Sequence, residues 1–270
     1  MPINSISLRL VAAAAFVLAS TLAAFAQTPS PDVLKDLAPT GKLRAAINFG
    51  NGVLAQKGPS GEAKGVTPEL AAALAKKLGV PVDYVPLQAA GKAFEALSSG
   101  NVDIAFIAIE QKRAAQIDFS PPYVLIQGTY LVLKDSPLKD VGDVDKDGVR
   151  IGVGLASVYD LYLTRTLKHA TLVRNTVGGA AAGIPPFREQ HLDAAAGVRE
   201  PLDAYAKEHA DVRVMPGHFE EIRQAMGTQK GHAAGAAYVR AFIEEMKANG
   251  FVADALKRSG QTAPVAPAEK

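Results

Sequence analysis

In the first half of the chain, short runs of apolar residues alternate with segments whose apolar residues recur at helical spacing. Leu70, Leu74 and Leu78 recur on one face of a predicted helix that ends at Gly79. By the same reasoning, strands are predicted at residues 43–49, 80–85 and 102–109, and a second short helix ends at Gly100. Strands and helices that alternate in this way predict a parallel sheet with right-handed crossovers, which is an α/β unit.

The second half of the chain repeats this pattern. Strands are predicted at residues 149–153, 170–174, 192–197 and 212–214, and helices at residues 157–168 and 201–209. Each half also places an aspartate near the start of a strand, in the similar segments 101–105 (NVDIA) and 191–195 (HLDAA). The shared motif indicates two related lobes. Asp103 and Asp193 lie too early in their strands to reach a cleft, so we expect them in turns or caps.

The end of the chain is predicted to be helical and then irregular. Apolar residues keep helical spacing from Tyr238 to Phe251, with breaks expected at Gly250 and near Gly260. Residues 261–270 (QTAPVAPAEK) are rich in proline, alanine and polar residues, and we expect a disordered tail there.

The first 26 residues have the pattern of a secretory signal peptide. Arg9 precedes an apolar run at residues 10–22, and Ala24-Phe25-Ala26 matches a signal-peptidase site, so the mature protein is expected to begin at Gln27. An uncleaved anchor is the alternative, but the run is shorter than the roughly 20 residues that span a bilayer. We therefore expect an exported protein that does not itself span the membrane.

Composition narrows the possible chemistry. The chain has no cysteine, which excludes thiolate metal sites and thiol nucleophiles. A net charge of +2 does not favour a nucleic acid or an anionic membrane surface as partner. Residues 143–148 resemble the start of a calcium loop, but Gly154 stands where such a loop needs a glutamate. We expect neither a metal nor a cofactor.

One segment carries a more specific signal. The predicted strand at 102–109 is followed by Arg113 and then by residues 118–123 (DFSPPY). This pattern resembles the extracellular solute-binding proteins of family 3, the receptors of ABC importers. The resemblance implies an α/β, two-lobed periplasmic-binding-protein clamshell of type II, each lobe a sheet flanked by helices. It further implies that lobe 1 comprises residues 40–133 plus 225–260 and lobe 2 residues 134–224, with hinge strands near 124–134 and 220–227.

The resemblance also assigns a role to Arg113. In this family the matching arginine holds a ligand carboxylate, and a guanidinium offers paired donors that fit such a group. A solvated surface arginine is the alternative. The chain departs from the family by about two fewer residues before the arginine, so Glu110 and Lys112 are further candidates for the pocket rim.

Other candidate ligand contacts follow from the same comparison. Residues 155–159 lead from a strand into a helix N-terminus, where Ser157 and Tyr159 are candidates for contact with an anionic group. Ser157 as a plain N-cap, and Tyr159 packed on its helix, remain open. Asn48 and Phe49 end the first strand where relatives place an aromatic residue against the ligand, although Phe49 equally suits the core.

The region 196–200 departs most from amino-acid-binding relatives. Those proteins carry an aspartate for the ligand's α-ammonium group about five residues after the strand aspartate, and here Val198 stands in that place. Arg199 follows it and would add positive potential to the cleft, whereas Glu200 is the alternative acceptor. An ammonium group buried without an acceptor is unfavourable.

The resemblance, taken with these residues, implies a periplasmic binding protein that closes on a small anionic or carboxylate solute, amino-acid-like or an organic acid, and delivers it to an inner-membrane ABC permease. We expect it to be a monomer and not an enzyme. Two alternatives stay open: an exported dehydratase of the cyclohexadienyl type, for which Glu110 and Glu200 are the candidate acid–base groups, and a sensory module that presents the ligand to a membrane receptor.

Overall fold

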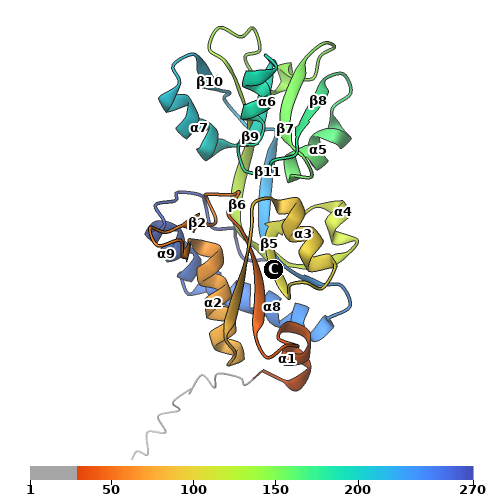
Figure 1. The fold of residues 1–270 in the computed structure, drawn as a ribbon, viewed down its shortest axis with the longest axis vertical. Coiled ribbons are helices and arrows are strands. Elements are labelled where there is room, and N and C mark those ends of the chain that lie inside the picture. Colours follow the sequence, from red (N-terminus) through yellow and green to blue (C-terminus); the bar gives the residue numbers. More distant parts are fainter. Residues whose placement is uncertain (1–28, 270) are drawn as a thin grey trace, which may run out of the picture.

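The computed structural model describes residues 29–269, and the predicted signal peptide lies outside them. Two long strands, β6 (Ile117–Leu133) and β11 (Glu220–Gln229), pair antiparallel and run through both lobes of the molecule (Figure 1). The strands follow the order β4-β1-β5-β11-β6-β9-β7-β8, and β10 (Val212–Val214) pairs with β6. We call the part around β4, β1 and β5 lobe 1 and the part around β9, β7 and β8 lobe 2.

In lobe 1, the parallel strands β1 (Leu43–Asn48), β4 (Val82–Leu87) and β5 (Ile104–Ala108) are connected through helices. The helices of this lobe are α1 (Pro31–Leu37), α2 (Val66–Leu78), α3 (Ala90–Ser98), α8 (Ala233–Ala248) and α9 (Phe251–Arg258). A small hairpin, β2 (Gln56–Lys57) with β3 (Ala63–Lys64), precedes α2, and the short α4 (Gln111–Ala114) follows β5.

Lobe 2 repeats this plan. Strand β7 (Arg150–Gly154) lies between β8 (Thr171–Asn175) and β9 (Ala194–Val198), and both pairings are parallel. Its helices are the 3₁₀ turn η1 (Val141–Asp143), α5 (Val158–Thr166), α6 (Ile184–Glu189) and α7 (Arg199–Glu208). In each lobe the first strand is central, and a long crossing strand, β11 or β6, completes that half of the sheet.

The two aspartate motifs occupy matching places in this plan. The Asp103 carboxylate accepts a hydrogen bond from the Arg44 N–H at 2.7 Å, and the Asp193 carboxylate accepts one from the Arg150 N–H at 2.8 Å. Each aspartate therefore fastens the start of the third strand of its lobe to the start of the first. As predicted, neither carboxylate lines the cavity between the lobes, but each joins two strands and does not serve a turn or a helix cap.

The apolar residues that predicted the helix at 67–78 are buried as expected. Leu70, Leu74 and Leu78 of α2 lie in the main core against the sheet. The helix ends at Gly79, whose φ of 70° is left-handed and suits a residue without a Cβ.

The predicted disordered tail requires a correction. In residues 261–269, Val265 bridges Val124 of β6, the Leu125 N–H donates to the Pro264 carbonyl at 3.0 Å, and the Ala266 N–H donates to the Tyr123 carbonyl at 3.1 Å. Ala266 is also buried. The composition misled because small residues and prolines suit an irregular edge segment as well as a disordered one.

Within residues 29–269, no helix combines the length and the hydropathy that a membrane crossing demands.

Candidate functional site

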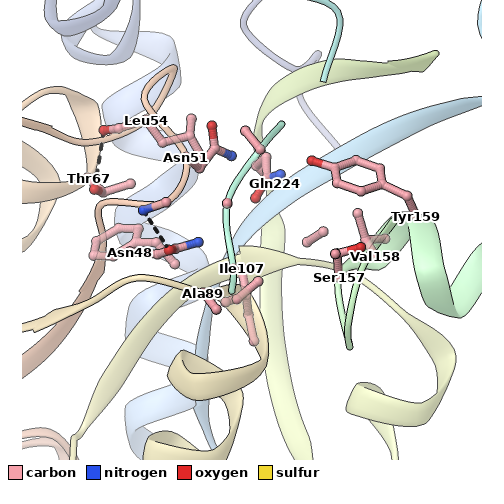
Figure 2. Close-up of a pocket in the computed structure, with 18 of the residues that line it drawn as sticks. Asn48, Asn51, Leu54, Thr67, Ala89, Ile107, Ser157, Val158, Tyr159 and Gln224 are labelled. Carbon is pink, nitrogen blue, oxygen red and sulfur yellow. Dashed lines mark hydrogen bonds between the residues drawn. The ribbon is translucent and has the colours of Figure 1, made fainter. Parts of the chain in front are cut away.

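A cavity of about 40 Å³ lies between the two lobes, at the carboxyl ends of their parallel strands (Figure 2). Lobe 1 supplies polar side chains from Asn48, Asn51 and Thr67, and lobe 2 supplies Ser157 and Tyr159. Among the residues that the structure describes, Arg113 is the only charged side chain in the lining. The geometry is that expected for an α/β fold, in which ligands bind beyond the carboxyl ends of the strands.

Arg113 is placed by the short helix α4, directly after β5. Its side chain is nearly fully buried, and its guanidinium donates to the Ala108 carbonyl at 3.1 Å and to the Ala156 carbonyl of lobe 2 at 3.0 Å. Burial lowers the pKa of Arg113 to about 10, and the nearby Glu110 carboxylate opposes that change. The group therefore stays cationic at neutral pH, with further N–H donors available to an anion.

Glu110 determines where α4 begins. Its carboxylate accepts from the Lys112 N–H at 2.8 Å and from the Arg113 N–H at 3.2 Å, and it also pairs with Arg165 of α5. Glu110 and Lys112, both considered as rim residues, do not belong to the cavity lining. Glu110 instead lies behind Arg113 and fixes the backbone that carries it.

The lobe 2 side of the cavity is the turn that leads into α5. Ser157 is the N-cap of this helix and accepts from the Asp160 N–H at 3.2 Å, and its side chain also lines the cavity. Ala156 has a left-handed φ of 56°, an unfavourable conformation for a residue with a Cβ, and its carbonyl accepts from Arg113. Tyr159 is buried, which raises the pKa of its hydroxyl and keeps it a neutral donor.

The two candidates at the end of β1 differ in position. Asn48 lines the cavity, and its Oδ1 accepts from the Gly50 N–H at 3.0 Å (Figure 2). Phe49 is absent from the lining. It packs against the core, and the Lys57 ammonium lies 5.6 Å from its ring centroid.

Val198 and Arg199 also lie outside the cavity lining. Val198 is fully buried, and its N–H donates at 2.9 Å to the carbonyl of Ala180, a residue that does line the cavity. The Arg199 guanidinium donates to the Gln127 Oε1 at 2.7 Å and to the Gly217 carbonyl. These contacts hold the Arg199 guanidinium on the β6 side of lobe 2. The positive potential expected from Arg199 therefore lies there and not in the cavity lining.

Glu200, the alternative ammonium acceptor, lines a separate and larger groove beyond the loop at residues 178–180. Burial raises the pKa of its carboxyl group. Neither Glu200 nor Glu110, the two acid–base candidates of the enzymatic alternative, lines the cavity that contains Arg113.

Sequence reasoning missed several lining residues. Gln224 is 4% exposed, lies at a β-bulge of β11 and is directed toward Tyr159 across the cavity in Figure 2. The lining segment 178–180 crosses to lobe 1, where the Ala180 N–H donates to the Gly50 carbonyl at 2.5 Å. The adjacent glycines at 178 and 179 were the available signal for that loop, whereas Gln224 lies in a segment of mostly polar residues, EEIRQAMGTQ, and no sequence feature singled it out. Within the described residues, no group of three or more acidic or histidine side chains is arranged to hold a metal.

Comparison with known proteins agrees with this architecture. Residues 54–261 match the family model described as bacterial extracellular solute-binding proteins, family 3. A search of curated protein sequences finds no match. The structure is similar to the ancestral amino acid-binding protein AncCDT-1, a precursor of cyclohexadienyl dehydratase, with 26% identity, a TM-score of 0.69, and coverage of 83% of this chain and 98% of the other.

Two further solved structures share the fold. The cysteine-binding protein from Campylobacter jejuni has 22% identity and a TM-score of 0.71, covering 84% of this chain and 92% of its own. A mutant of ArgBP from T. maritima has 17% identity and a TM-score of 0.71, covering 84% and 99%. The predicted two-lobed α/β fold of type II is therefore confirmed, and the chain belongs to family 3 of the bacterial extracellular solute-binding proteins.

Proposed function

We propose that this protein is the substrate-binding component of an ABC importer and that its ligand is a small carboxylate, or a similar anion, without an obligatory α-ammonium group. The observation that carries the proposal is the charge of the cavity lining. Arg113 is the single charged side chain among the described lining residues. A buried guanidinium whose neighbours in the described lining are all neutral favours an anion as its partner in the cavity, while the Glu110 carboxylate lies outside that lining.

The neutral lining residues suit the rest of such a ligand. Ser157, Tyr159 and Asn48 offer hydroxyl and amide groups, while Phe106 and Val158 offer apolar contact. An α-ammonium group would need an acceptor of strength similar to a carboxylate, and the described lining contains none. An ammonium group buried without a carboxylate would cost more than the about 2–7 kcal/mol of an unpaired neutral polar group, because its charge also loses its hydration.

The ligand would bind by closure of the lobes. Arg113 and Ser157 come from opposite lobes, so both contact one ligand only when the lobes are together, and the ligand shifts the population toward that form. The moving bodies in this proposal are residues 40–133 with 225–260, and residues 134–224. The crossing strands β6 and β11 supply the hinge.

Membership of an extracellular family supports export of the mature protein to the periplasm and a membrane permease as its partner. The experiment that tests the proposal is a thermal-shift screen of carboxylic acids, 2-oxo acids, amino acids and amines. A ligand that binds only the folded form raises its melting temperature. We expect hits among acids without an amino group, and a hit list confined to amino acids or amines would contradict the proposal.

A further inference from the structure

We propose that Glu110 and Arg165 form an interlobe positioning pair that stabilises the closed arrangement and fixes the backbone of Arg113. The importance of this pair for a ligand rests on the proposed function, but the pair itself is a property of the two lobes. Glu110 follows β5 in lobe 1, and Arg165 lies in the last turn of α5 in lobe 2.

The two oxygens of the Glu110 carboxylate have different partners. Oε2 accepts from the N–H groups of Lys112 and Arg113, so it organises α4 within lobe 1. Oε1 pairs with Nη1 of Arg165, so it joins lobe 1 to lobe 2. One side chain thus connects the backbone of the anion-binding residue to the opposite lobe.

Of the ion pairs within residues 29–269, this is the only one that joins the two lobes. The other interlobe hydrogen bonds named above, from Arg113 to Ala156 and from Ala180 to Gly50, end on neutral backbone carbonyls. Opening the lobes returns Arg165 to water and leaves Glu110 with its local N–H partners. The pair therefore favours the closed form relative to the open one.

A matched ion pair within lobe 2 provides the control. Arg174 pairs with Asp160 at 2.9 Å, and the exposed fractions of the two side chains, 39% and 6%, resemble the 36% and 2% of Arg165 and Glu110. Both pairs join a half-exposed arginine to a buried carboxylate. Only the pair of Arg165 crosses between lobes.

The test is single-molecule FRET on the mature protein without added ligand. Because the chain has no cysteine, Lys92→Cys on α3 and Lys168→Cys after α5 place two dyes at exposed positions of the two lobes. We expect Arg165→Gln to lower the ratio of closed to open molecules by about two- to fivefold, the upper part of the range for ion pairs that are partly exposed. Arg165→Lys should restore part of the ratio, and Arg174→Gln should leave it unchanged.

Glu110→Gln completes a double-mutant cycle. Its side-chain oxygen can still accept from the backbone of α4, but its charge is lost. We expect it to shift the ratio as Arg165→Gln does, and the double variant to shift it no further. If Arg165→Gln has the same ratio of closed to open molecules as the parent protein, the proposal is overturned. This holds both when the two proteins close equally and when neither of them closes. Fully additive effects would also overturn the proposal. Because no ligand is used, either result leaves the proposed function to its own test.

Discussion

At the scale of single residues, Arg113 is the side chain on which the proposed function depends. We expect Arg113→Ala to reduce the affinity for a carboxylate ligand by about 2–5 kcal/mol, because the anion would be desolvated without its partner. Arg113→Lys should recover only part of this loss, since an ammonium group lacks the paired donors of the guanidinium. Calorimetry on folded variants measures both effects. An affinity unchanged by Arg113→Ala would remove this residue from the site.

A second prediction at this scale concerns the ionisation of Glu220. It lies at the start of β11 with one carboxylate oxygen buried and unpaired, and burial raises the pKa of Glu220 to about 7. Because the folded protein binds the proton more tightly than the unfolded chain, this group favours folding below the unfolded pKa of about 4.5. That contribution is lost as the pH rises through 7.

Glu220→Gln removes this dependence. We expect the variant to melt at a higher temperature than the parent protein at pH 8, with the difference shrinking toward pH 5. Glu221→Gln, at the exposed neighbouring position, is the control and should show no such trend. Melting temperatures of the parent and the Glu220 variant that differ by a constant amount from pH 5 to pH 8 would contradict the assignment.

At the scale of elements, the loop at residues 178–180 is the part of lobe 2 that closes over the cavity. A Cβ on Gly178 would collide with Ala89 and with the Gln88 carbonyl of lobe 1. Both partners belong to the opposite lobe, so the collision exists only when the lobes are closed. We expect Gly178→Ala to weaken ligand binding by tenfold or more while the melting temperature of the free protein changes little.

Gly142→Ala is the matched control for that variant, because a Cβ at Gly142 would meet nothing within 4 Å. It should bind as the parent does. Equal ligand affinity in the two glycine variants would show that closure does not bring residue 178 against Ala89.

A further prediction at this scale concerns the stability that the C-terminal segment contributes. Residues 261–269 add backbone hydrogen bonds to β6 and bury Ala263 and Ala266. We expect deletion of residues 261–270 to lower the melting temperature by about 5 °C, which corresponds to roughly 2 kcal/mol in a domain of this size. Scanning calorimetry measures the change, and an unaltered melting temperature would mean that the segment adds no stability.

The elements that sequence reasoning located are those with a strong local signal. Apolar runs such as 43–49 and 102–109 became central parallel strands, because a strand buried on both faces needs apolar residues throughout. The helices α1, α4 and α6 were not predicted. With seven, four and six residues they are too short to show helical spacing, and the caps on Ser30 and Glu110 define the first two.

For the candidate site, the sequence located groups at the ends of strands but not the loops that cover them. Asn48, Arg113, Ser157 and Tyr159 line the cavity, since strand ends meet at one edge of a parallel sheet. Val198 lies at such an end too, but the loop that contains Ala180 covers it. Gln224 was missed because its position depends on a bulge in the pairing of β11 with β6.

At the scale of the whole molecule, two similar half-sheets share a pair of crossing strands, and the cavity lies where their strand ends face each other. The central claim is that this cavity binds a carboxylate and that its described lining offers no carboxylate to accept from an α-ammonium group. Isothermal calorimetry with a matched pair tests it most directly: the best carboxylic acid from the thermal-shift screen and its α-amino counterpart. We predict that the acid without the amino group binds at least as tightly as the amino acid. An amino acid that binds tenfold tighter would contradict the account and point to Glu200 as the acceptor.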